Sequence, residues 1–295
     1  MTKRSIAYLS LTTTSLIWSV GAILIKYSLN FTSPYTFLFW RFLIVAWIFL
    51  PFVIIQVKKE SLTVKELPKI FILGFMATTL TLVLLFWGTK LTSAVEAVII
   101  NSLSPIFIII GGGLFLKEKI SRKIKIGAGL AVLGSILTVL QPILDNGLTG
   151  TNFKGNLLVF ISALFWAAYS LIIRKDESRH RYSALTLTGI SFIAGLITIT
   201  PLFLTQSDLS LAPQALPAIL YMAIFGSCIA YFTYNLGFSL IKACEASIFT
   251  HLQLVFSVPL AIIFLHEKID QWIILGVIII LVGVFLTEYK RRINT

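Results

Sequence analysis

The chain has 295 residues, of which 57% are hydrophobic and 12% are charged, and its formal net charge is +12. A soluble globular domain is typically about 25% charged, so a chain this apolar is not expected to cover its own surface with polar groups. The composition therefore excludes an ordinary soluble protein and indicates an integral membrane protein. The two cysteines, Cys228 and Cys244, have the spacing of neither a disulfide framework nor a metal site.

Apolar segments without Asp, Glu, Lys or Arg recur along the whole chain. A helix needs about 20 apolar residues to cross about 30 Å of hydrocarbon, and most of these segments are that long. Strands of a membrane barrel would be shorter and would alternate strictly, so the spans are predicted to be helical. The first follows Lys3 and Arg4 without a small-residue cleavage site, so we expect a retained helix. The ten predicted spans are 5–25, 42–57, 70–89, 97–116, 126–144, 155–173, 182–207, 209–241, 246–265 and 271–287.

The positive charges are distributed as membrane topology predicts. If the N-terminus is cytoplasmic, ten spans place all but five of the 24 lysines and arginines on the cytoplasmic side, in agreement with the positive-inside rule. We therefore expect a multi-pass protein of the cell membrane with both ends in the cytoplasm, and no nucleic-acid partner. The second span reaches full length only if Arg41 lies near the interface or faces inward. The exceptions to the charge rule are Lys26, Arg41, Lys90, Lys154 and Lys268.

The chain repeats part of its own sequence at a shift of 149 residues. LFLKEKI at 114–120 recurs as IFLHEKI at 263–269, and AVEA at 94–97 recurs as ACEA at 243–246. The repeat predicts two five-helix units. Their predicted bounds are 5–142 and 152–289.

The odd number of spans in each unit fixes their relative orientation. The second unit must enter the membrane from the opposite side. The predicted fold is therefore all-α and integral to the membrane, with ten transmembrane helices arranged as an inverted repeat of two five-helix units. Such repeats are typical of secondary transporters, whose substrate site lies near the midplane between the halves.

Polar and aromatic residues in the middle of spans are candidates for a substrate pathway, because polar groups deep in a bilayer tend to face an interior path. The alternative for each is structural: hydroxyl groups often bond a neighbouring helix, and aromatic rings often anchor a helix at the interface. The pathway candidates are Trp18 in the first span, Asn101 and Ser104 in the fourth, Trp166 and Tyr169 in the sixth, Tyr231, Tyr234 and Asn235 in the eighth, and His251 and Gln253 in the ninth.

Four glutamates occupy equivalent positions in the two halves. Glu96 and Glu245 lie about one turn inside their helices, where the helix dipole favours a carboxylate; the alternative is a role in proton coupling or gating. Glu118 and Glu267 lie in the repeated loops. There a carboxylate is expected to pin a turn through backbone N–H groups.

The order of these motifs resembles a known family. Trp18 in the first helix, AVEA at 94–97, Pro105, LKE at 116–118, and Gly127 with Gly134 resemble the EamA-type transporter family of the drug/metabolite transporter superfamily. The resemblance covers almost the whole chain and occurs in both halves. It implies ten helices in an inverted repeat, and it implies carriage of small metabolites, often outward, with amino acids as frequent substrates.

We therefore expect a transporter, secondary-active or facilitative, that exports a small metabolite, amino acids before others, by alternating access between the halves. A drug- or nucleoside-type exporter is the alternative. A membrane enzyme or receptor is disfavoured: HEKID at 266–270 is not the zinc motif HExxH, since Asp270 replaces the second histidine, and no phosphate-binding loop occurs. We expect no cofactor and no metal. The partners are the bilayer and a small molecule; a monomer is expected, and small-residue helix faces leave a homodimer open.

Overall fold

The chain is described by a computed structural model. It covers residues 2–60, 62–63, 65–118, 151–177, 182–250, 252–266 and 271–288, with 121–123, 125–127, 129–130, 132–134 and 136–137. All regular structure in these residues is helical. The α-helices are α1 (Lys3–Ser28), α2 (Pro34–Lys59), α3 (Leu67–Phe75), α4 (Thr81–Leu91), α5 (Ala94–Asn101), α6 (Ser104–Phe115), α8 (Thr151–Glu177), α9 (Ala184–Leu204), α10 (Leu216–Tyr221), α11 (Ala230–Leu240), α12 (Ala243–Thr250), α13 (Leu252–Leu265) and α14 (Gln271–Glu288).

Two π-helical segments and one short 3₁₀ helix complete the list. The π-helical segment η1 (Met76–Leu80) joins α3 to α4, and η3 (Met222–Ile229) joins α10 to α11. The 3₁₀ helix η2 (Pro213–Ala215) precedes α10. The third and eighth predicted spans are therefore continuous helices. Near their middle the hydrogen bonds span five residues instead of four, so each turn there is wider.

Seven described segments are long and apolar enough to cross a membrane. They are Lys3–Ser28, Pro34–Lys59, Leu67–Leu91, Ala94–Phe115, Phe153–Lys175, Ala184–Leu204 and Pro213–Leu240. The ninth and tenth predicted spans contain shorter apolar helices, Leu252–Leu265 and Gln271–Gly283, and the fifth is described only in part. The all-helical membrane fold is confirmed, while the full number of ten spans stays a prediction.

Helix starts follow local capping chemistry. Ser33 and Ser183 cap α2 and α9, each accepting a hydrogen bond from the backbone N–H three residues later, at 3.1 and 3.2 Å. Ser93 caps α5 in the same way, at 3.0 Å from the Glu96 nitrogen. A serine at this position satisfies one of the free donors of the first turn. The second span thereby begins at Pro34, and Arg41 lies inside it.

The sequence repeat is also a repeat of backbone structure. The helices α4, α5 and the segment η1 have counterparts α11, α12 and η3 at or near the shift of 149 residues. Lys117 and His266, also 149 residues apart, both have a φ of 53°. The left-handed region is uncommon for residues other than glycine, so its appearance at both positions indicates that the two helix ends are built alike.

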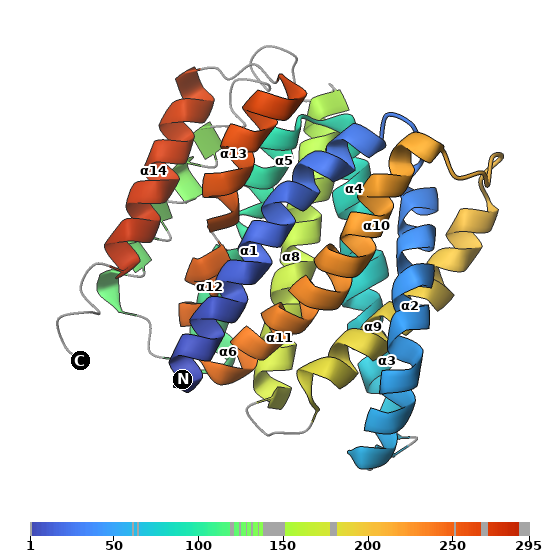
Figure 1. The fold of residues 1–295 in the computed structure, drawn as a ribbon. Helices are drawn as coiled ribbons and strands as arrows, with labels where there is room; N and C mark the ends of the chain where they lie inside the picture. Colours follow the sequence, from blue (N-terminus) through green and yellow to red (C-terminus); the bar gives the residue numbers. More distant parts are fainter. Residues whose placement is uncertain are drawn as a thin grey trace.

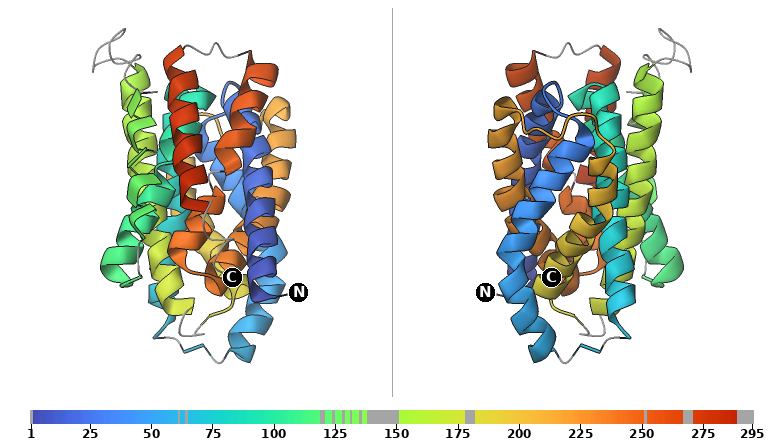
Figure 2. Two further views of the ribbon diagram at one scale, coloured as in Figure 1. Left: turned by 90° about the vertical axis from the view of Figure 1, so that its left-hand side faces the viewer. Right: turned by 90° about the vertical axis from the view of Figure 1, so that its right-hand side faces the viewer.

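The two halves exchange their first helices. Helix α1 packs against α11, α12 and α13 of the second half, and α8 packs against α4, α5 and α6 of the first. The helices α2 and α9 pack against each other. Figure 1 shows α1 and α8 running in opposite directions, as units with an odd number of spans require. Figure 2 shows the helices lying along one long axis.

The outer surface is apolar where a bilayer would touch it. Trp47 on α2 is 70% exposed and Phe115 at the end of α6 is 75% exposed. Many other leucine, isoleucine and phenylalanine side chains of the long helices are exposed as well. A soluble monomer rarely exposes contiguous apolar surface on this scale, so these faces fit contact with lipid.

Candidate functional site

A cavity lies between the two halves and draws its wall from both. It leaves about 110 Å³ for the centres of water molecules, whereas one buried water needs about 10–15 Å³. It therefore has room for several waters or a small solute. The lining residues are Trp18, Ala22, Ile25, Arg41, Thr81, Leu82, Leu85, Phe86, Thr89, Ala94, Ala97, Val98, Asn101, Ser102, Ser104, Pro105, Trp166, Met222, Tyr231, Gln253 and Leu254.

A break in the fourth span shapes one wall of the cavity. Helix α5 ends at Asn101 and α6 begins at Ser104. Pro105 has no N–H to donate to the carbonyl of Asn101 four residues earlier, so the α-helical ladder is interrupted there. Shorter i→i−3 bonds close the chain there instead: the Leu103 nitrogen donates to the Ile100 carbonyl at 3.0 Å, and the Ile106 nitrogen donates to the Leu103 carbonyl at 2.9 Å. The interruption places the polar groups of Asn101, Ser102 and Ser104 in the cavity wall.

Four aromatic side chains meet at the middle of the bundle and are called here the aromatic cluster: Trp18, Trp166, Tyr231 and Tyr234. The ring of Trp18 is 5.5 Å from that of Trp166 and 5.7 Å from that of Tyr231, both edge-on. The rings of Trp166 and Tyr234 are 4.9 Å apart. Such offset and edge-on pairs add about 0.5–1.5 kcal/mol each beyond burial of their area. The four rings of the aromatic cluster are therefore packed against one another in fixed orientations.

The π-helical segments hold two members of the aromatic cluster in place. Trp18 Nε1 donates to the carbonyl of Gly226 in η3 at 3.0 Å, and the Tyr231 hydroxyl donates to the carbonyl of Ala77 in η1 at 3.2 Å. A π-helical turn shifts the regular hydrogen-bond ladder and is often found at functional sites. Here the carbonyls of the two segments are the acceptors that orient the aromatic side chains.

A second layer of polar side chains fills the bundle on the far side of the aromatic cluster. The Tyr169 hydroxyl donates to Asn235 Oδ1 at 3.1 Å, and Asn235 Nδ2 donates to Thr188 Oγ1 at 3.0 Å. The hydroxyls of Ser170 and Tyr234 lie 2.6 Å apart. All five side chains are buried. Tyr169, Tyr234 and Asn235 thus lie outside the cavity wall in this structure.

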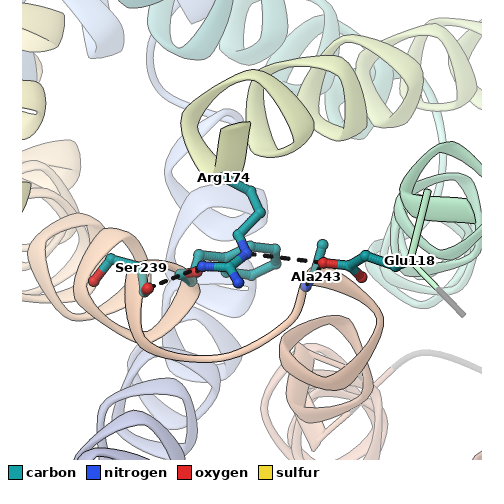
Figure 3. Close-up of polar contacts among 5 residues, drawn as sticks. Glu118, Arg174, Ser239 and Ala243 are labelled. Carbon is teal, nitrogen blue, oxygen red and sulfur yellow. Dashed lines mark hydrogen bonds and ion pairs between the residues drawn. The ribbon is translucent and has the colours of Figure 1, made fainter. Parts of the chain in front are cut away.

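A further set of polar contacts joins the helix ends beyond this second layer, on the side away from the cavity. Glu118, after the end of α6, accepts a hydrogen bond from the Ala243 nitrogen of α12 at 3.1 Å. Arg174 Nε on α8 lies 3.8 Å from the same carboxylate oxygen, and Arg174 Nη1 donates to the Ser239 carbonyl at 3.0 Å. Figure 3 shows these groups converging from three segments. We call Glu118, Arg174, Ser239 and Ala243 the closing cluster.

Glu96 lies apart from the cavity wall, in the first turn of α5. It is buried, and its carboxylate accepts a hydrogen bond from the Thr92 hydroxyl. Lys26 Nζ donates nearby to the carbonyls of Thr89, at 2.9 Å, and Thr92. These contacts fit a carboxylate held at a helix N-terminus. His251 and the side chain of Glu245 lie outside the part of the chain that the structure describes.

The structure therefore brings six of the predicted pathway residues to one cavity and places Tyr169, Tyr234 and Asn235 outside its wall. The six are Trp18, Asn101, Ser104, Trp166, Tyr231 and Gln253. Their role in transport stays a prediction. The separation follows from position along the helices, because Tyr169 and Asn235 lie about one turn beyond Trp166 and Tyr231 in the direction of the closing cluster.

Arg41 is the charged residue among the lining residues that the pathway prediction did not include. Its side chain is 1% exposed, its Nε donates to Ser227 Oγ at 2.7 Å, and its Cζ lies 5.9 Å from the centre of the Phe192 ring. The signal in the sequence was an arginine within an apolar helix, a position that is costly and usually functional. In the sequence alone, Arg41 bears only on the length of the second span.

Comparison with known proteins identifies the family. The model of the EamA-like transporter family matches the chain twice, at residues 5–140 and 153–289. The chain belongs to the EamA-like transporter family. It is a multi-pass membrane protein with the two-repeat architecture of that family.

Relatives of this EamA-like protein match it over nearly their whole length. Two proteins of Archaeoglobus fulgidus, each described as an uncharacterized transporter, are 28% and 29% identical to it over 288 and 285 residues. These alignments cover 97% and 96% of this chain and 98% of each relative. The uncharacterized transporter YyaM of Bacillus subtilis is 27% identical, with 92% of this chain and 89% of the relative covered.

A solved crystal structure shares the fold of the EamA-like protein. It superposes with a TM-score of 0.74 over 99% of this chain and 100% of its own, at 18% identity. At that identity the likeness concerns the fold alone. The shared fold thus extends over 99% of this chain.

Proposed function

We propose that this EamA-like protein carries a small metabolite across the membrane through the cavity between its halves, by alternating access. The observation that carries the proposal is the position of the cavity between the two halves. A cavity with aromatic and hydrogen-bonding groups lies on one side of the aromatic cluster, and packed polar layers lie on the other. Ligand sites are usually concave, mostly apolar and fitted with a few polar groups.

The cavity extends toward one end of the bundle, and that end indicates which side of the membrane it faces. Ile25, Thr89 and Ala94 line it, and each lies within about one turn of the end of its helix. On the predicted topology this end faces outside and the closing cluster faces the cytoplasm, so we assign the structure to an outward-facing state. In an inverted repeat the two halves can exchange roles, which yields an inward-facing state of similar packing.

We further propose amino acids as the first substrate class to test, with export as the direction. The support is the family membership and the naming of relatives as transporters; their names specify no substrate. The aromatic wall fits an apolar or aromatic side chain, and it also favours a second candidate, an amphipathic drug or nucleoside. Coupling of transport to protons through Glu96 and Glu245 is part of the proposal, although the contacts of Glu96 support a capping role equally well.

Counterflow into proteoliposomes tests the proposal. Vesicles loaded with unlabelled amino acids are expected to accumulate a labelled trace of at least one of them saturably, while vesicles without protein do not. Trp18→Leu is expected to slow this accumulation about tenfold, equivalent to about 1.4 kcal/mol of lost interaction, because it removes a wall of the cavity and the bond to Gly226.

Trp47→Leu is the matched control, because Trp47 is 70% exposed on the outer surface. It should transport like the parent. If Trp18→Leu inserts normally and transports as fast as Trp47→Leu, the cavity is not the pathway. If no amino acid, nucleoside or other pooled metabolite accumulates in vesicles holding folded protein, the transport proposal itself is wrong.

A further inference from the structure

The cavity wall carries one formal charge among the residues that line it, and that charge is the guanidinium of Arg41. No aspartate or glutamate belongs to the described wall. An arginine in the hydrocarbon zone is expensive, and natural proteins normally pair it or let it face water or a ligand. The described wall therefore carries a positive charge and no acidic side chain that would balance it.

The hydrogen bonds of Arg41 leave most of its donors unused. Its one hydrogen bond within the described structure joins Nε to Ser227 Oγ. Nη1 is buried without a hydrogen-bond partner there. A guanidinium has five N–H donors in a rigid fork, so four remain for another group. A buried unpaired donor is costly, and a charged one more so, which indicates a partner that the protein chain itself does not supply.

The helix α6 adds a second positive feature to the same wall. It begins at Ser104, in the cavity, after the break at Asn101, and it runs for 12 residues. The N-terminus of a helix carries a partial positive charge and attracts anions. In transporters with broken helices such ends point at anionic groups of substrates. The full charge of Arg41 and the partial charge of α6 therefore act on one cavity.

The position of Ser227 explains why the guanidinium is presented rather than folded away. Ser227 lies in η3, and its hydroxyl bonds back to the Met222 carbonyl at 2.8 Å while accepting from Arg41. The ring of Phe192 lies beside the guanidinium. One edge of the guanidinium is thus fixed by a neutral partner, which orients the group without neutralising it.

We infer that the cavity binds an anionic oxygen group of the substrate, a carboxylate or a phosphate, on Arg41. This inference deepens the proposed transport function and rests on it. An arginine fork is the preferred partner for planar or tetrahedral anionic oxygens. The aromatic cluster, with Trp18, Trp166 and Tyr231 in the same wall, takes the apolar part of the molecule. Neutral nucleosides and cationic drugs lack the group that Arg41 requires.

Binding measured on purified protein in detergent tests the inference apart from transport. The three probes are L-phenylalanine, L-phenylalaninamide and phenyl phosphate, and the readout is the midpoint of thermal unfolding over a concentration series. L-Phenylalanine or phenyl phosphate should bind at least about tenfold more tightly than the amide. The tighter of the two identifies the anionic source, carboxylate or phosphate.

Variants of Arg41 add a second arm. Arg41→Gln should abolish the preference for the anion, while Arg41→Lys, which keeps the charge and loses the fork, should keep part of it. Ser227→Ala removes the partner that orients the guanidinium and should weaken the preference, whereas Trp47→Leu on the outer surface should keep it in full. The comparison of acid with amide in the parent protein requires no variant to fold.

The outcomes separate the inference from the proposed function. Equal binding of the three probes, absence of binding included, overturns the anion site, and so does a folded Arg41→Gln variant that still prefers the acid. Counterflow of neutral metabolites that Arg41→Gln leaves unchanged would overturn the anion site while transport stands. Anion-selective binding through Arg41 without counterflow of any metabolite would support the site and sink the transport proposal.

Discussion

Replacement of Gly88 by alanine is expected to lower the free energy of unfolding in detergent by about 1–3 kcal/mol, the usual cost of overpacking. Gly88 lies on α4 where that helix meets α8. A Cβ there would stand 2.7 Å from the carbonyl oxygen of Gly155 and 3.0 Å from the backbone nitrogen of Val159. Backbone atoms of a helix cannot rotate away as a side chain does. Thermal or denaturant unfolding of the purified variant measures the effect.

Gly129→Ala is the matched control, since a Cβ at Gly129 meets nothing within 4 Å. It should leave stability unchanged or raise it by up to about 1 kcal/mol, the difference in helix propensity. Equal unfolding midpoints for the two variants would contradict the close approach of α4 and α8. Since α4 and α8 both contribute to the cavity wall, the Gly88 variant should also lose counterflow activity.

Replacement of Glu118 by glutamine is expected to shift the protein toward the state that is open at the closing cluster. The amide keeps an acceptor for the Ala243 nitrogen but loses the charge that attracts Arg174. Because Glu118 and Arg174 are 10% and 19% exposed, we expect about 1 kcal/mol, or about a fivefold change in population. Asn235→Cys, in a background without Cys228 and Cys244, reports the shift through its rate of reaction with a membrane-impermeant thiol reagent.

The expected result is about a fivefold faster reaction at position 235 when Glu118→Gln is present, with reagent on the side of the closing cluster. Asp208→Asn serves as the control, because that carboxylate is exposed and accepts a hydrogen bond from Ser210, two residues away. It should leave the rate unchanged. An unchanged rate with Glu118→Gln as well would mean that the closing cluster does not hold this end shut.

Much of the fold was predictable because a bilayer imposes length and polarity on every span. The apolar runs marked the seven long segments. The two π-helical segments were not predictable, because no residue type specifies them. Their neighbours are distant in sequence: η1 packs against α8 and α9, and η3 packs against α1 and α2. The ninth and tenth predicted spans contain helices of 14 and 18 residues. An apolar run in the sequence therefore does not fix the length of the helix that forms in it.

The candidate site was predictable by residue type more than by position. Helical spacing puts Cys228, Tyr231 and Asn235 on one stripe of the eighth span, with Tyr234 beside it. Which of them would face the cavity depended on where the aromatic cluster divides the bundle, which is a property of packing between α1, α8 and α11. Arg41 was visible in the sequence, but its role depends on Ser227, 186 residues away, and sequence spacing carries no information about that contact.

The central claim is that substrate passes through the cavity beside the aromatic cluster, and a single block in that cavity tests it most directly. Ala22→Cys places a thiol in the wall, and Gly129→Cys places one in open space outside it, both without Cys228 and Cys244. Each protein is assayed by counterflow before and after reaction with a bulky thiol reagent. We predict that modification at position 22 abolishes counterflow, that substrate protects against it, and that modification at position 129 changes nothing. Undiminished counterflow after complete modification at position 22 would contradict the account.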